Sequence, residues 1–106
     1  MPAQVIFHPP HCIAIDVDDT LIGRDGLDLG VVAFIEAKRE EGMEVMLWSM
    51  RGRAYARAVA EKHRVAHLFD AIISKPGWIL DDQGWQWVAK TRVVPLDMAR
   101  GEGDGL

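Results

Sequence analysis

Four short runs of apolar residues stand out along this chain. They are rich in Val and Ile and lack alternation, which is typical of strands buried on both faces of a sheet. The runs cover residues 12–15, 45–48, 71–73 and 78–80. The pattern therefore predicts four short buried strands.

Two segments between these runs have apolar residues at helical spacing. Residues 31–41 follow Asp28, which suits an N-cap, and precede Gly42, which stands where a helix ends. Residues 53–64 repeat the helical spacing between the second and third runs. An order of strand, helix, strand, helix, strand is typical of a parallel sheet with crossover helices.

The predicted order gives one domain. We expect an α/β fold over residues 1–98, with a Rossmann-like parallel sheet and three layers. Residues 85–87 and 92–94 are candidates for additional edge strands. Residues 99–106 end in a glycine-rich stretch and are expected to form a disordered tail.

The amino-acid composition excludes several classes of protein. Of the 106 residues 49% are hydrophobic and 26% charged, which is typical of a globular domain and excludes wholesale disorder. No apolar run approaches the roughly 20 residues that span a bilayer, and residues 1–10 lack a signal-peptide pattern, so a cytoplasmic protein is expected. The net charge of −4 argues against a general nucleic-acid binder. Cys12 begins an apolar run and is expected to be a buried small hydrophobe.

Polar residues stand at the end of every predicted strand. In a parallel sheet the carboxyl ends of the strands lie on one edge, where open α/β folds place their sites. Turn-forming residues alone would not give two acidic clusters, a hydroxyl and a lysine. We therefore expect one crevice lined by Asp16, Ser49, Ser74, Lys75, Asp81 and Asp82.

The charge of this set limits its chemistry. Carboxylates at Asp16, Asp18, Asp19, Asp81 and Asp82 would repel one another unless a cation neutralised them. Mg²⁺ is the natural partner of carboxylates that have no nearby His or Cys ligand set. Because Mg²⁺ shares its coordination sphere with substrate phosphates, the pattern predicts a phosphorylated substrate.

The same motifs resemble those of the haloacid-dehalogenase (HAD) superfamily. Residues 13–21 read as an apolar strand followed by Asp-x-Asp-x-Thr-Leu, the first motif of that family. Ser49 resembles the second motif, Lys75 the third, and residues 79–82 the fourth, an apolar strand that ends in paired acids. Lys75 and Asp81 are only six residues apart, which resembles the minimal HAD phosphatases.

The resemblance implies a phosphatase mechanism. Asp16 would attack phosphorus and form an aspartyl-phosphate, and Asp18 would act as general acid and then as general base. Ser49 would hydrogen-bond a phosphoryl oxygen, and Lys75 would link that phosphoryl group to the nucleophile. The same resemblance assigns Mg²⁺ to Asp16, the Asp18 carbonyl, Asp81 and Asp82, the last either directly or through water.

Three further positions bear on the site. Thr20 is expected to fix the turn after Asp18 and to border the substrate. Arg51 precedes the second helix, where a positive charge opposes the helix dipole. Its side chain is therefore either simply solvated or grips a second anionic group of the substrate. The tryptophans at 78, 85 and 87 fit packing or a subunit contact better than stacking on a base.

The spacing leaves no room for a cap domain. Residues 22–29 alone separate the first motif from its helix, so residues 23–26 form at most a small hairpin. An open site suits a macromolecular substrate. Nucleic acid is expected to bind this chain only as such a substrate. It equally suits a small substrate covered by a neighbouring subunit of a homo-oligomer.

Two other classes compete with a phosphatase. A response-regulator receiver would carry its phospho-accepting Asp on the third strand, but that run ends in Ser74 and Lys75. A catalytically silent HAD-like binding domain would tolerate losses at the motif positions, yet each holds a competent residue. The phosphatase interpretation is therefore preferred, with the silent domain as the main alternative.

Overall fold

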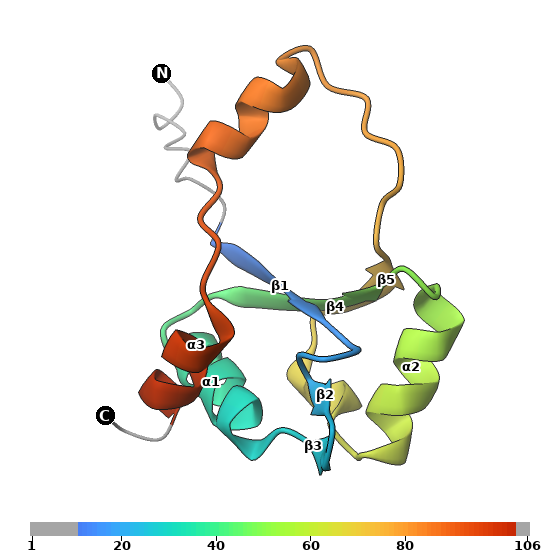
Figure 1. The fold of residues 1–106 in the computed structure, drawn as a ribbon, viewed down its shortest axis with the longest axis vertical. Helices are drawn as coiled ribbons and strands as arrows, with labels where there is room; N and C mark the ends of the chain where they lie inside the picture. Colours follow the sequence, from blue (N-terminus) through green and yellow to red (C-terminus); the bar gives the residue numbers. More distant parts are fainter. Residues whose placement is uncertain (1–10, 104–106) are drawn as a thin grey trace, which may run out of the picture.

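A three-stranded parallel sheet lies at the centre of residues 11–103, the part of the chain that the computed structural model describes (Figure 1). Its strands are β1 (Cys12–Asp16), β4 (Glu44–Ser49) and β5 (Ala71–Ser74), in the order β1-β4-β5. Both pairings are parallel. Three of the four predicted strands and their parallel arrangement are thus confirmed.

Two helices connect these strands, and both cover the same face of the sheet. They are α1 (Leu29–Glu40) and α2 (Arg53–Lys62), close to their predicted bounds. Val45 and Leu47 of β4 belong to one buried cluster with Ile35 of α1 and Ala60 of α2. Two right-handed crossovers that advance in one direction place their helices on one side. The three-layer arrangement is therefore not found within residues 11–103, where α1 and α2 form a single layer (Figure 1).

The remaining elements are short. An antiparallel hairpin of β2 (Ile22–Gly23) and β3 (Gly26–Leu27) follows β1, as the sequence predicted for this segment. The 3₁₀ turns η1 (Ala66–Leu68) and η2 (Gly84–Lys90) precede β5 and α3 (Leu96–Gly103) respectively. No helix within the described range is long and apolar enough to cross a membrane.

The fourth predicted strand is wrong. Residues 78–80 have no strand structure, and Trp78 is 96% exposed. Only residues 75–77 separate this run from β5, whereas a parallel strand needs a crossover of about a dozen residues or more. The predicted edge strands are also wrong, because residues 85–87 lie in η2 and residues 92–94 are irregular.

Two further expectations need correction. The tail boundary at residue 99 differs from the structure, in which α3 continues to Gly103 and buries Ala99 against the domain. Residues 104–106 lie outside the described range. Cys12 is exposed rather than buried, because it begins the edge strand β1. Partial burial, followed by the nearby carboxylates of Glu44 and Asp70, raises the pKa of its thiol.

Asp28 ties α1 to α3. Its Oδ1 accepts hydrogen bonds from the amides of Gly30 and Val31, at 3.0 and 3.1 Å, which confirms the predicted N-cap. Its Oδ2 accepts a hydrogen bond from Arg100 Nε at 2.6 Å. Burial opposes ionisation of Asp28, but Arg100 and the two amides outweigh it and lower the pKa of the carboxyl. The one carboxylate therefore caps α1 and holds α3 against it.

We expect the Asp28→Ala variant to lower the free energy of unfolding by about 2 kcal/mol, because both the cap and the ion pair are lost. Asp28→Asn keeps a capping oxygen and should cost only about 0.5 kcal/mol. Urea denaturation of the two variants and the wild type measures the difference. Equal losses in both variants would contradict the capping role.

The ionic part of this stabilisation should depend on pH. Asp28 has its pKa lowered below 3.8 in the folded chain, so its charge stabilises the fold fully above 3.8. The advantage of wild type over Asp28→Asn should then disappear as the pH falls through the lowered pKa.

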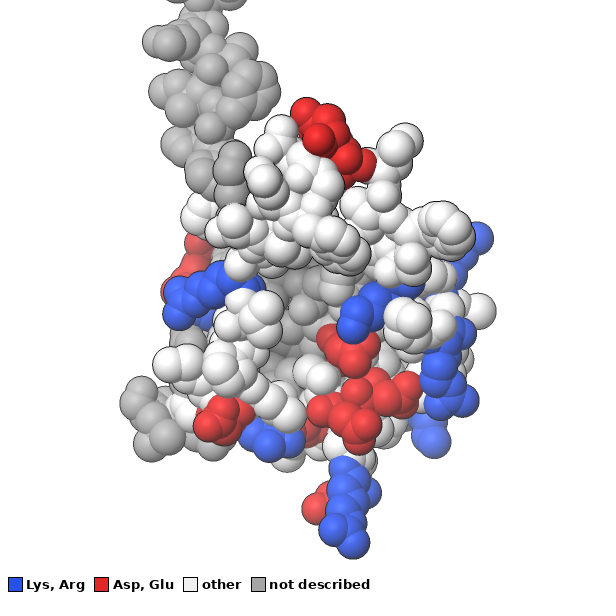
Figure 2. Space-filling model, turned by 45° about the horizontal axis from the view of Figure 1, so that its top comes forward, with Lys and Arg blue, Asp and Glu red and all other residues white. Residues whose placement is uncertain are grey.

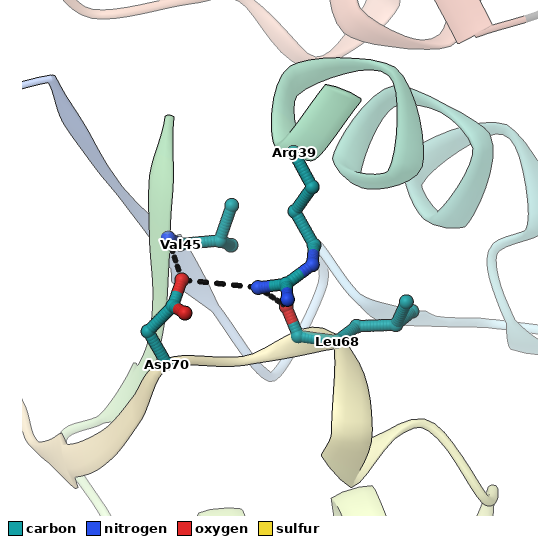
Figure 3. Close-up of polar contacts among 4 residues, drawn as sticks. All are labelled: Arg39, Val45, Leu68 and Asp70. Atoms are coloured by element: carbon teal, nitrogen blue, oxygen red, sulfur yellow. Dashed lines mark hydrogen bonds and ion pairs between the residues drawn. The ribbon is translucent and has the colours of Figure 1, made fainter. Parts of the chain in front are cut away.

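A second polar network holds the far ends of β4 and β5 together (Figure 3). Arg39 Nη1 donates to the carbonyl of Leu68 at 2.8 Å and to Asp70 Oδ2 at 3.0 Å. The same Oδ2 accepts the amide of Val45 at 2.8 Å. The Val45 amide, with Arg39, lowers the pKa of Asp70. This network fixes the start of β4 relative to α1, and hence the strand that carries Ser49 at its other end.

Candidate active site at the carboxyl edge of the sheet

The ends of the three parallel strands meet at one edge of the sheet, as the sequence predicted. Asp16 ends β1 in register with Trp48, and Ser49 ends β4 in register with Ser74 of β5. Strand pairing therefore brings residues together from segments more than 20 positions apart. This edge carries Asp16, Ser49 and Ser74, with Lys75 directly after β5.

The chain leaves the sheet immediately after Asp16. The amides of Leu21 and Ile22 donate to the carbonyls of Asp16 and Val17, at 3.1 and 3.0 Å, and close a tight turn. Asp19 adopts a φ of 62°, a left-handed conformation that Asp tolerates better than most residues. Asp18 lies in this turn, where it forms an isolated bridge with Ile22.

Thr20 takes part in this turn through its backbone, because its amide donates to the Val17 carbonyl at 3.3 Å. Asp18 and Asp19 are exposed, whereas Val17 and Leu21 are fully buried on either side of them. The two buried residues anchor the turn in the core, and the acidic side chains consequently stand in solvent beside the sheet edge.

Ser49 lies deeper than the sequence suggested. Its side chain is 2% exposed, and its Oγ accepts the amide of Arg51 at 3.0 Å. The hydroxyl hydrogen remains available to one acceptor. The Ser49 carbonyl accepts the amide of Lys75 at 2.9 Å, which fixes the start of the segment after β5. Ser49 thus organises the edge through its backbone and its hydroxyl oxygen.

The start of α2 is closed by β5. Gly52, the N-cap, has a φ of 100°, a conformation that favours glycine. It offers no side chain, and Ser74 Oγ instead accepts the amide of Arg53 at 3.0 Å. Helix α2 therefore begins at the same edge as Asp16 and Ser49, and its first turn borders the candidate site.

Lys75 is held over the sheet edge by an aromatic ring. Its Nζ lies 5.7 Å from the centroid of the Trp48 ring, a cation–π distance. Trp48 is the register partner of Asp16. Lys75 follows β5 and Asp16 ends β1, so Trp48 of the central strand β4 lies between these two outer strands.

Tyr55 is a site residue that the sequence analysis missed. Its Oη donates to Asp18 Oδ1 at 2.7 Å, and this hydrogen bond raises the pKa of the phenol. Arg51 stacks on the Tyr55 ring at 4.0 Å and places Nη1 3.9 Å from Asp18 Oδ2. Arg51 lies in the turn before α2 and Tyr55 in the first turn of that helix, so both reach Asp18 from the start of α2.

Asp81 and Asp82 are not brought to this edge. They lie in an exposed turn of the segment between β5 and η2, which runs away from the sheet in Figure 1. Asp81 Oδ1 accepts the amide of Gln83 at 2.7 Å. Within residues 11–103, no group of three or more His, Cys, Asp or Glu side chains is arranged to hold a metal ion. The predicted four-residue metal set is therefore not assembled in the described arrangement.

Acidic side chains form separate groups on the face of the molecule drawn in Figure 2. Figure 2 shows one broad group of acidic side chains with Lys and Arg side chains beside it, and a separate acidic group at the top. A hollow of about 300 Å³ lies along residues 76–87, and none of Asp16, Asp18 or Ser49 lines it. The hollow therefore belongs to the segment after β5 and not to the candidate active site.

The chain matches no family model, and no curated protein or solved structure is significantly similar to it.

Proposed function

We propose that this chain is a phosphate-monoester hydrolase of the HAD type with a Rossmann-like core and no cap domain. The observation that carries the proposal is the convergence of Asp16, Ser49 and Lys75 on one sheet edge, with Asp18 in the turn directly after Asp16. A carboxylate, a hydroxyl and an ammonium group from three strands suit a phosphoryl group. The resemblance of the strand-end motifs supports the same chemistry.

In the proposed reaction an Asp16 carboxylate oxygen attacks phosphorus, and the bond between phosphorus and the ester oxygen breaks. Asp18 gives its proton to the departing oxygen, so the product leaves as an alcohol. Water then attacks the aspartyl-phosphate, Asp18 accepts a proton, and inorganic phosphate and free Asp16 are restored. Lys75 offsets the negative charge of the phosphoryl group, and the Ser49 hydroxyl can donate to one of its oxygens.

Mg²⁺ is the proposed cofactor. The donors at the edge are a hard carboxylate oxygen of Asp16 and the Asp18 carbonyl, which fit Mg²⁺ in type. In number they fall short of the expected set, because Asp81 and Asp82 lie elsewhere. Mg²⁺ is commonly bound through one or two carboxylates, waters and substrate phosphates, so the smaller set is chemically sufficient. When bound, the ion would offset the repulsion between the anionic nucleophile and the anionic substrate.

Arg51 is the proposed second contact to the substrate. Its side chain is 64% exposed beside Asp18, and it lies in the turn just before the N-cap of α2. A guanidinium there can bind a phosphate or carboxylate group beyond the reacting phosphoryl group. Since the hairpin β2–β3 is the sole insertion after β1 within the described residues, such a contact would supply part of the selectivity.

A catalytically silent phosphate-binding domain is the second candidate. Two observations favour it, namely the burial of Ser49 and the separation of Asp81 and Asp82 from Asp16. Such a domain would bind phosphate compounds at the same edge without turning them over.

Trapping of the intermediate tests the proposal. The purified chain, incubated with 4-nitrophenyl phosphate and Mg²⁺, should release nitrophenol and phosphate. Rapid acid quenching and borohydride reduction should then convert the acyl phosphate at Asp16 into homoserine, which peptide mass spectrometry detects. Absence of both phosphate release and modification at residue 16 would overturn the proposal. A phosphate-dependent rise in melting temperature without release would instead favour the silent domain.

A further inference from the structure

Both oxygens of the Asp18 carboxylate have a neighbour from α2 or from the turn just before it. Tyr55 Oη donates to Oδ1 at 2.7 Å, within the range of a strong hydrogen bond. Arg51 Nη1 lies 3.9 Å from Oδ2, which is close enough for charge attraction but too far for a hydrogen bond. The two oxygens are therefore not equivalent, because Oδ1 is engaged and Oδ2 remains open.

Tyr55 is itself held firmly. It is half-buried and packs against the core cluster, and Ala56 beside it on α2 is fully buried. The Arg51 guanidinium covers its ring at 4.0 Å. A phenol on a helix that is packed in this way has little freedom to follow Asp18. The hydrogen bond therefore restricts Asp18, which stands in an exposed turn with 46% of its side chain accessible.

We propose that Tyr55 is a positioning residue that fixes the Asp18 side chain and leaves Oδ2 as the oxygen that carries the transferred proton. This inference rests on the proposed phosphatase function. A general acid must reach the departing oxygen at hydrogen-bond distance, and free rotation of Asp18 in solvent would make that geometry rare. The phenol removes this freedom through an atom that takes no part in the proton transfer.

The proposal predicts a loss that depends on the leaving group. An alkoxide needs a proton as it departs, whereas 4-nitrophenolate is a stable anion and needs little help. The quantity to measure is kcat/KM, which reports the steps up to leaving-group departure. Tyr55→Phe should lower kcat/KM for glycerol 2-phosphate by about tenfold, a modest part of the usual gain from general acid catalysis. Its effect on 4-nitrophenyl phosphate should be at most about twofold, since that ester needs little protonation.

Two controls sharpen the experiment. Arg57→Gln changes an exposed side chain on the same helix that pairs with Glu61, and it should affect the two esters equally and slightly. Asp18→Asn should also lower kcat/KM more for glycerol 2-phosphate than for 4-nitrophenyl phosphate, and the difference should be larger than in Tyr55→Phe. Adding Tyr55→Phe to Asp18→Asn should then cost nothing more, because both changes act through one carboxylate.

The outcomes distinguish a failure of the Tyr55 inference from a failure of the proposed phosphatase function. Equal losses on both esters would assign Tyr55 a structural role and overturn the inference, as would no loss on either. An additional loss in the double variant would also overturn it, because Tyr55 would then act independently of Asp18. Failure of the wild type to hydrolyse either ester would overturn the proposed function itself. Melting curves of each variant check that the fold is retained.

Discussion

Replacement of Asp16 by Asn should lower phosphate release by at least about a thousandfold, because an amide oxygen is a far weaker nucleophile than a carboxylate. The side chain keeps nearly the same shape, and Asp16 ends β1, whose register with β4 is set by backbone pairing. The fold should therefore survive. Steady-state release of phosphate from 4-nitrophenyl phosphate measures the loss, and circular dichroism checks the structure.

A matched control removes a carboxylate elsewhere. Asp97→Asn changes an exposed acidic residue in the first turn of α3, and it should leave the rate unchanged while losing the same unit of charge. If the Asp16→Asn protein kept more than a few per cent of wild-type activity, Asp16 would not be the nucleophile. A loss of similar size in Asp97→Asn would indicate an effect of net charge.

The strands of the sheet were predictable because runs of consecutive apolar residues mark the segments that become buried. Residues of β1, β4 and β5 carry apolar runs. Helical spacing marks α1, between the capping Asp28 and Gly42, and it also marks α2. Each signal lies within a few residues of the element it specifies. Given the strand order β1-β4-β5, the right-handed crossover rule places both helices on one face of the sheet.

The segment after β5 shows where an apolar run misleads. Residues 78–80 are as hydrophobic as β5, but a strand also needs a neighbour that it can reach. The three residues between Ser74 and Trp78 cannot carry the chain through a parallel crossover. The apolar run therefore has no neighbouring strand with which to pair. Asp81 and Asp82, which follow it, are consequently not held at the sheet edge.

Helix α3 illustrates the opposite case. Its sequence contains glycines that suggest a tail, and its hydrophobic content is modest. Its packing comes from Ala99 buried against the domain and from Arg100, which reaches Asp28 across 72 positions of sequence. Contacts of such length leave no local pattern, so the helix was missed.

The residues of the candidate site also differ in whether a local sequence pattern predicts them. Asp16, Ser49 and Lys75 were predictable because each stands at a strand end, and parallel pairing brings strand ends together. Tyr55 was not, because its contact with Asp18 depends on the orientation of α2 relative to the turn after β1. Side chains that reach a site from a helix flank are specified by packing, which a single sequence does not reveal.

Removal of divalent metal should abolish phosphate release, and Mg²⁺ should restore it. Asp16 and Asp18 are two residues apart at the sheet edge, and a phosphate monoester adds further negative charge beside them. Lys75 and Arg51 supply positive charge, but the described contacts direct Arg51 toward Asp18 and Lys75 toward Trp48. Activity before and after EDTA, and after added Mg²⁺, measures the effect. Ca²⁺ should restore little activity, because its coordination is larger and less rigid.

The Mg²⁺ dependence also tests whether Asp81 and Asp82, in the segment after β5, bind the metal. In the described arrangement Asp81 and Asp82 take no part in the site, so Asp81→Asn and Asp82→Asn should leave the half-saturating Mg²⁺ concentration unchanged. A rise of about tenfold in either variant would mean that residues 78–82 move to the sheet edge when metal and substrate bind, since loss of a metal ligand weakens binding by about that amount or more. Full activity in a metal-free preparation would contradict the metal assignment altogether, and Lys75 would then be the main source of charge compensation for the attack by Asp16.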